Sequence, residues 1–162
     1  MTDYLIEQLV KKQPTKKDSL KKTGLFAVVV ISGLLVPFIP FAFLVTVVLI
    51  VIAIILIRRM NVEYEYIYFN GDLDIDKIMN CETRKRAVST SVKEMDVIAP
   101  KGSQAVLGYQ HLKALDFTTC DPQGKVYEMV TMVKGEKTRV LFEPNEKLLN
   151  AMRDIAPRKV NF

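Results

Sequence analysis

The dominant feature of the sequence is an apolar segment from Leu25 to Ile57, thirty-three residues without a charged side chain. A helix that spans a membrane needs about 20 apolar residues, so this segment is too long for one comfortable crossing. Pro37 and Pro40 interrupt it, and a proline in a helix interior removes a hydrogen bond and clashes with the preceding turn. The pattern predicts a transmembrane helical hairpin over residues 15–60, with its turn near residues 36–40.

The first apolar half is short for a crossing unless its helix begins well before Leu25. Thr15 and Asp18 have the spacing of a capping box, in which each side chain accepts a hydrogen bond from the backbone N–H of the other residue. This motif predicts a first helix over residues 16–36, and a second follows over residues 40–59. Lysines near the start of the first helix can extend their ammonium groups to the headgroup region.

Basic residues flank the apolar segment on both sides, at Lys21, Lys22, Arg58 and Arg59, and the intervening turn has none. Because lysine and arginine stay on the cytoplasmic side, we expect a cell-membrane protein with two spanning helices and both termini in the cytoplasm. The competing interpretation is one long, kinked and tilted helix, which places one basic flank on the wrong side.

The amino-terminal segment, residues 1–14, is interpreted as an amphipathic juxtamembrane arm. Leu5, Ile6, Leu9 and Val10 recur at helical spacing, so the pattern predicts a helix from Asp3 to Lys12. Such a helix lies in the interface of the inner leaflet, or else it packs on the soluble domain or frays.

From Val62 the pattern changes to the alternation that is typical of strands. Val62–Phe69 is aromatic and β-branched, and Asn70-Gly71, which favours a type I′ hairpin turn, separates it from Asp72–Asp76. Tyrosines share one face of the first strand, where they pack in a core or meet the headgroups as an aromatic belt. These are Tyr64, Tyr66 and Tyr68. Further strands are predicted over residues 84–90, 92–98, 111–119, 125–133 and 138–142.

An amphipathic helix closes the series, with Leu148, Leu149 and Met152 on one face and Pro157 after its end. The order of about seven strands and a terminal helix, together with the Tyr-x-Tyr-x-x-Asn-Gly-x-Leu stretch from Tyr66 to Leu73, resembles a pleckstrin-homology-like (PH-like) barrel. Behind a membrane hairpin, it is similar to the bacterial membrane-anchored PH-like proteins of Gram-positive bacteria. The resemblance covers Val62 to Ala156. It implies an α+β membrane protein with a cytoplasmic PH-like domain over residues 61–162, and a binding scaffold without catalytic residues.

The first β-hairpin carries Asp72, Asp74 and Asp76 on one strand face. PH domains that bind phosphoinositides place lysines and arginines around this hairpin, whereas a ladder of carboxylates would repel phosphate. We therefore expect no phosphoinositide binding. Three carboxylates on a flat strand do not encircle a cation, which favours a solvated polar face over a metal site.

The formal net charge is +5, and residues 1–24 hold six lysines against three acidic residues. The excess sits beside the apolar segment, which indicates attraction to an anionic inner leaflet and not nucleic-acid binding. Arg84, Lys85 and Arg86 either contact lipid headgroups or an acidic partner, or pair with Glu82 or Glu94 at a solvated strand end. The residues expected to touch lipid or a partner are Lys21, Lys22, Arg58, Arg59, Arg84, Lys85 and Arg86.

No catalytic, cofactor-binding or metal-binding residues are expected. His111 is the only histidine, and the apolar segment has no ionisable group of the kind that an ion or proton pathway needs. The sequence predicts a non-catalytic interaction or scaffolding module that contacts the bilayer and a protein partner. The alternatives are an anionic-lipid sensing domain, or an accessory subunit of a membrane enzyme or transport complex.

Overall fold

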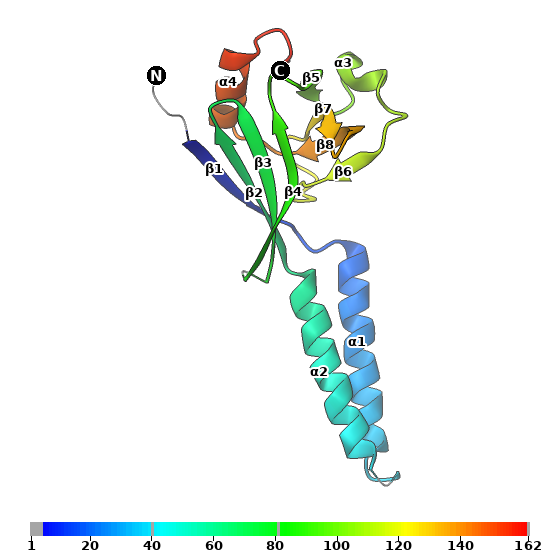
Figure 1. Cartoon of the computed structure of the whole chain (residues 1–162). Coiled ribbons are helices and arrows are strands. Elements are labelled where there is room, and N and C mark those ends of the chain that lie inside the picture. The colour runs from blue at the N-terminus through cyan, green and yellow to red at the C-terminus, as the bar shows by residue number, and fades with distance from the viewer. Residues whose placement is uncertain (1–4, 40, 81, 162) are drawn as a thin grey trace.

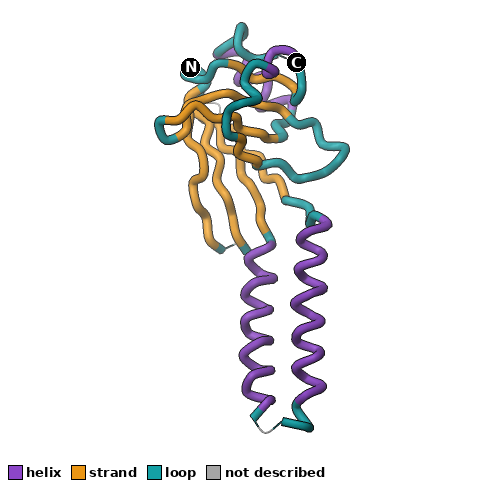
Figure 2. Tube along the Cα trace, turned by 90° about the vertical axis from the view of Figure 1, so that its right-hand side faces the viewer, coloured by secondary structure: helices purple, strands orange, loops and turns teal. Residues whose placement is uncertain are grey.

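The computed structural model describes residues 5–39, 41–80 and 82–161. Two long helices extend from one end of a mixed α and β domain (Figure 1), and they run side by side in a second view as well (Figure 2). In chain order the described residues form β1 (Leu5–Lys11), α1 (Lys16–Leu35), α2 (Ala42–Met60), β2 (Val62–Phe69), β3 (Asp72–Met79), β4 (Thr83–Ser91), β5 (Val97–Pro100), α3 (Gln104–Leu107), β6 (Ala114–Asp116), β7 (Tyr127–Val133), β8 (Glu136–Phe142) and α4 (Glu146–Ile155).

The prediction of a helix from Asp3 to Lys12 was wrong, because Leu5–Lys11 form strand β1. This strand pairs antiparallel with β2, from Leu5 opposite Phe69 to Lys11 opposite Glu63. Ile6 and Val10 are buried at 4% and 8% exposure, while Leu5 and Leu9 are 55% and 59% exposed. The spacing of these four apolar residues is compatible both with one face of a helix and with the two faces of a strand. The choice between helix and strand depends on a partner strand that lies far along the chain.

The helical pair is an insertion into the connection between two neighbouring strands. The N–H of Lys12 donates to the carbonyl of Val62 at 3.1 Å, which continues the β1–β2 ladder toward the helices. The first sheet, with strand order β1-β2-β3-β4, therefore uses residues from both sides of the insertion. The first sheet thus includes β1, which lies outside the range 61–162 predicted for the domain.

The ends of α1 and α2 follow the local signals in the sequence. The capping box is present: the Thr15 hydroxyl accepts the Asp18 N–H at 3.3 Å, and the Asp18 carboxylate accepts the Thr15 N–H at 3.2 Å. Both helices agree with the predicted bounds to within two residues. A turn through residues 36–39 and 41 joins them, while Pro40 lies outside the described residues.

The rest of the first sheet confirms the predicted β2–β3 hairpin. Asn70 and Gly71 have φ angles of 49° and 101°, the left-handed values that a tight hairpin turn needs. The strand predicted over residues 92–98 is confirmed only at its end, where β5 begins at Val97. Residues before it form a turn, in which the N–H groups of Glu94 and Met95 both donate to the carbonyl of Ser91.

The second sheet has the order β5-β7-β8-β6, with β6 parallel to β8 and the other pairs antiparallel. The two sheets do not close into the predicted barrel, because the chain leaves β4 through a turn and β4 does not pair with β5. Helix α4 is confirmed, with the Asn145 side chain accepting the Leu148 N–H at 2.8 Å as its cap. Leu148, Leu149 and Met152 of α4 are buried against the sheets.

The core between the sheets is built around the tyrosines of β2, which confirms their assignment to a core. Tyr64, Tyr66 and Tyr68 are 6%, 0% and 1% exposed. The Tyr66 hydroxyl donates to the Phe117 carbonyl at 2.7 Å and accepts the Glu143 N–H at 3.2 Å, so one buried group joins both sheets. Burial raises the pKa of Tyr66, because the low-dielectric core disfavours the phenolate.

Candidate functional site

The predicted basic cluster lies on β4, where its arginines are already engaged by carboxylates. Arg84 Nε lies 3.0 Å from Asp76 Oδ2, and Arg84 also pairs with Glu65. Arg86 NH1 lies 3.1 Å from Asp74 Oδ2. These partners differ from the predicted Glu82 and Glu94, which are close in sequence, because strand pairing places β3 and β2 beside the arginines.

The acidic ladder of β3 is accordingly not the solvated face that the sequence predicts. The Asp76 side chain is only 6% exposed, and both Arg84 and Arg86 contact it. The register of β3 and β4 shifts after Ile75, so that Asp76 stands opposite Arg86. This bulge places a cation over each of the two inner aspartates and neutralises most of the ladder.

Lys85 differs from its arginine neighbours because it stands opposite Lys77. No carboxylate among the described residues forms an ion pair with either lysine. Both lie toward the end of the sheet that meets the helices, since Met79 at the end of β3 pairs with Val62 directly after α2. The uncompensated positive charge on β3 and β4 at this end of the sheet therefore comes from lysines and not from arginines.

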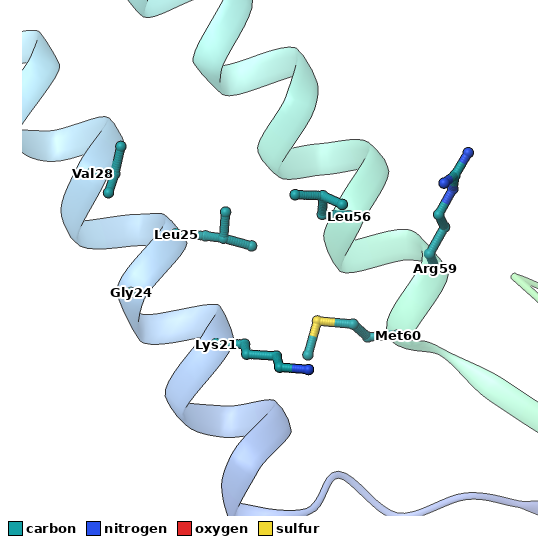
Figure 3. A pocket seen from close by; sticks show the side chains of 7 residues that line it. All are labelled: Lys21, Gly24, Leu25, Val28, Leu56, Arg59 and Met60. Atoms are coloured by element: carbon teal, nitrogen blue, oxygen red, sulfur yellow. The ribbon is translucent and has the colours of Figure 1, made fainter.

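Lys21 and Arg59, two of the cations predicted to touch lipid or a partner, line a groove between α1 and α2 (Figure 3). It has a volume of about 460 Å³ and an otherwise apolar lining. Leu25 and Leu56 extend into it from opposite helices, Lys21 lies next to Met60, and Arg59 points away from α1. The other residues of the lining are Gly24 and Val28. The two remaining predicted contacts, Lys22 and Arg58, do not belong to this lining.

Gly24 contributes the open space on the α1 side of the groove. A Cβ atom built at this position meets no heavy atom within 4 Å. Gly33, which lies further along α1 toward the turn, has equally open surroundings but does not line the groove. The groove therefore lies at the cationic end of the helical pair, next to a glycine that has no side chain to fill it.

Sequence reasoning missed a second surface, the outer face of the first sheet. Residues paired across β1, β2 and β3 place apolar side chains on it beside acidic ones. The apolar members are Leu5, Leu9, Ile67, Phe69 and Ile78. Six carboxylates and three cations share this face: Glu7, Glu63, Glu65, Asp72, Asp74, Asp76, Lys11, Arg84 and Arg86. The alternation of Leu5, Glu7, Leu9 and Lys11 was the signal that could have revealed it.

Two further features give no sign of chemistry. A second pocket, of about 310 Å³, lies between the start of β7 and α4, and its lining mixes charged, polar and apolar groups. The buried Glu128 is paired with Arg139 at 3.4 Å and accepts a hydrogen bond from Gln110. Within the described ranges, no three His, Cys, Asp or Glu side chains are grouped so that they could hold a metal ion.

The family model for the bacterial PH-like domain (DUF6106) matches residues 2–162. The chain belongs to this family. The match includes β1, both long helices and both sheets, so the helical insertion is covered together with the PH-like part. No curated protein and no solved structure matched the chain.

Of the two predicted membrane spans, one corresponds to a candidate spanning helix in this PH-like protein. Among the described residues, only α2 is long and apolar enough to cross a membrane, and 6% of its apolar window is buried within the chain. Helix α1 has the length, but lysines occupy its first two turns and its uncharged part starts only after Lys22. On composition and length alone, the described part of the chain has one candidate span.

Proposed function

We propose that the protein is a membrane-anchored, non-catalytic interaction module that presents its PH-like domain at the cytoplasmic face of the cell membrane. The exposure of its two long helices supports the anchor. None of the described residues of α1 is buried, and Ala53 is the one buried residue of α2. A helix that is apolar all round and uncovered by its own chain needs cover from outside, which a bilayer provides.

The observation that carries the two-span arrangement is the pairing of β1 with β2. These strands precede α1 and follow α2, and they lie in one sheet over seven residue pairs. Both ends of the helical pair must therefore be on one side of the membrane. If α2 crosses the bilayer, α1 has to bring the chain across in the other direction.

The lysines of α1 are compatible with such a crossing. Its 20 residues extend about 30 Å, the thickness of a hydrocarbon core. Lys21 and Lys22 lie near the domain end, where their ammonium groups can reach the headgroups. Arg58 and Arg59 are in the last turn of α2 at that same end, so the positive charge favours a cytoplasmic domain.

The outer face of the first sheet favours a protein partner over a lipid surface. Leu5, Leu9 and Phe69 are 46% to 59% exposed, and apolar side chains grouped on a sheet face are typical of binding surfaces. The carboxylates on this face outnumber the cations, which opposes contact with an anionic bilayer. The expected partner is a protein segment that combines apolar and basic side chains.

Anionic-lipid sensing through Arg84 and Arg86 receives less support. Carboxylates neutralise both guanidinium groups within the sheet, so a lipid phosphate would have to compete with Asp74, Asp76 and Glu65. Lys77 and Lys85 remain available for such contacts, but each lysine contributes only about 1 kcal/mol at an anionic surface.

The topology can be tested by cysteine labelling in intact cells. Two variants are compared. The Cys81→Ser variant keeps Cys120, which is exposed on the domain, as its one cysteine. The second variant has both native cysteines replaced by serine and carries Phe38→Cys as its one cysteine. Phe38 is 80% exposed in the turn between the helices. A membrane-impermeant maleimide should label Cys120 only after permeabilisation and should label the turn cysteine from outside. Labelling of Cys120 in intact cells would overturn the proposal.

The interaction surface can be tested by site-specific photocrosslinking in native membranes. A photoreactive residue at Phe69 probes the outer face, and one at Met132, which is 45% exposed on β7, serves as the matched control. We expect a discrete protein adduct from Phe69 only, and its loss when Leu9 is replaced by glutamate. The same adducts from both positions would contradict a role for the outer face.

A further inference from the structure

We propose that the groove between α1 and α2 binds one anionic glycerophospholipid of the inner leaflet. An acyl chain lies against Leu25, Val28 and Leu56, and the headgroup phosphate contacts the ammonium group of Lys21. The inference rests on the membrane anchoring proposed above and adds a specific ligand to it.

The size and lining of the groove fit an acyl chain. Its volume of about 460 Å³ lies within the range of about 300 to 1,000 Å³ that is usual for ligand pockets. Leu25 and Leu56 extend into the space from opposite helices (Figure 3). Because Gly24 has no side chain, a flexible hydrocarbon can approach the α1 backbone at this point.

The polarity of the groove changes along the helix axis in the same sense as a lipid of the cytoplasmic leaflet. Lys21 and Val28 are seven residues apart on α1, which corresponds to about 10 Å along the axis. The charged end is next to the PH-like domain, and the apolar end is directed toward the turn. On α2 the order is the same, with Arg59 and Met60 nearest the domain and Leu56 further from it.

The charge of the groove selects an anionic headgroup. Its lining contains no carboxylate, and of its two cationic residues Lys21 points toward α2 across the groove, whereas Arg59 points away from α1 (Figure 3). No ion pair neutralises either of them among the described residues. The charge of Lys21 acts on the Asp18 carboxylate one turn before it, which Thr15 already holds in the capping box. A zwitterionic headgroup would bring a second cation beside Lys21 with only this engaged carboxylate to receive it, so a headgroup such as phosphatidylglycerol is favoured.

The experiment is native mass spectrometry of the full chain in detergent, titrated with dioleoylphosphatidylglycerol and, separately, with dioleoylphosphatidylcholine. Gly24→Leu fills the groove, and Gly33→Leu is its control, because both glycines have open surroundings and only Gly24 lines the groove. Lys21→Gln removes the cation, and Lys22→Gln is its control outside the lining.

We expect one saturable phosphatidylglycerol site, with an apparent Kd raised about tenfold by Gly24→Leu and about tenfold by Lys21→Gln. Both control variants should bind like the parent chain, and phosphatidylcholine should bind more weakly. Equal affinity in all four variants would overturn the proposal, as would equal affinity for the two lipids. Loss of binding in Gly24→Leu alone would refute the role of Lys21.

The cysteine-labelling test separates this inference from the anchor. If both cysteines are labelled as expected but the chain binds the two lipids equally well, only the groove site is contradicted. A turn cysteine that is not accessible from outside contradicts the anchor itself, whatever lipid the groove binds in detergent. If Gly24→Leu does not fold, the comparison of Lys21→Gln with Lys22→Gln still decides the headgroup contact.

Discussion

If the helical pair is an insertion between β1 and β2, the PH-like domain should fold without it. Lys12 and Val62 are hydrogen bonded at 3.1 Å at the end of the ladder, in a position to close a two-residue hairpin. We therefore predict that replacing residues 13–61 by Asn-Gly, the preferred type I′ turn, gives a water-soluble, folded domain. The comparison chain is the fragment 62–162, which begins at the domain boundary suggested by the hydrophobic pattern and lacks β1.

The two chains should differ by several kcal/mol. The fragment loses Ile6 and Val10, which are 4% and 8% exposed, and burial of such side chains contributes about 1.5 to 3 kcal/mol each. It also loses the Gln8 side chain, which bonds to the carbonyl of Glu143 and the N–H of Asn145 at 2.8 Å. The two apolar side chains alone account for about 3 to 6 kcal/mol. This is a large share of the about 5 to 15 kcal/mol that stabilises a typical domain.

The grafted chain has smaller losses of its own. Deletion removes the bond from the Gln13 N–H to the Thr119 carbonyl and the bond from the Asn80 N–H to the Asn61 carbonyl. Each contributes about 1 kcal/mol net. The graft should thus remain clearly more stable than the fragment.

Urea unfolding followed by far-UV circular dichroism measures the difference. We expect one cooperative transition for the graft, and for the fragment a midpoint lower by at least about 1 M, or no folded baseline. A fragment within about 1 kcal/mol of the graft would show that β1 is dispensable. That result would refute both the insertion and the argument that the sheet holds the two helix ends on one side of the membrane.

Three substitutions in the grafted domain test the core and the ion pairs. Tyr66→Phe removes the hydroxyl that joins the two sheets and should lower the free energy of unfolding by about 1 to 3 kcal/mol in urea. Burial raises the pKa of Tyr68 to about 12, above the ordinary value near 10. The folded state therefore keeps a proton that the unfolded state releases, stability should fall as pH rises from about 10 to about 12, and Tyr68→Phe should flatten that fall. Asp76→Asn leaves two arginines without their shared carboxylate and should lower stability by about 1 to 2 kcal/mol, whereas the exposed Asp72→Asn should change it by less than about 0.5 kcal/mol.

The elements that the sequence predicted well are those whose signals are local. The capping box at Thr15 begins α1, Pro37 lies in the turn after it, and Asn70-Gly71 defines the β2–β3 hairpin. In each case a few adjacent residues decide the backbone conformation. The amphipathic helix α4 belongs to the same class, since its buried face is visible in its own periodicity.

The elements that were mispredicted depend on partners distant in sequence. Strand β1 has an apolar pattern compatible with a helix, and it is a strand because β2 supplies a ladder across an insertion of about fifty residues. Likewise, the alternation of Val92 and its neighbours resembles a strand. In the structure these residues form a turn, and the turn places the side chains of Val92 and Met95 in the core. Helix α3 is a single turn of four residues and has no periodicity to detect.

The candidate site illustrates the same division. The sequence identifies Lys21 and Arg59 as juxtamembrane cations, but only the packing of α1 against α2 joins them in one groove. Conversely, Arg84 and Arg86 look available in the sequence, and pairing with β3 commits them to aspartates. Which charges remain available for a ligand is a property of the tertiary structure, because it depends on which opposite charges the fold brings near.

The insertion also determines how the domain faces its surroundings. One residue, Asn61, separates α2 from β2, and residues 12–15 separate β1 from α1, so both connections are short. Each is tied to the domain, through the Asn80 N–H to Asn61 and through the Gln13 N–H to Thr119. Two short, bonded connections prevent the swivelling that a single flexible linker allows. Each strand of the first sheet has one end near the helices, and the sheet extends lengthwise away from them (Figures 1 and 2). In a bilayer, the outer face would therefore stand upright beside the membrane, where a neighbouring membrane protein can reach it and the lipid surface cannot.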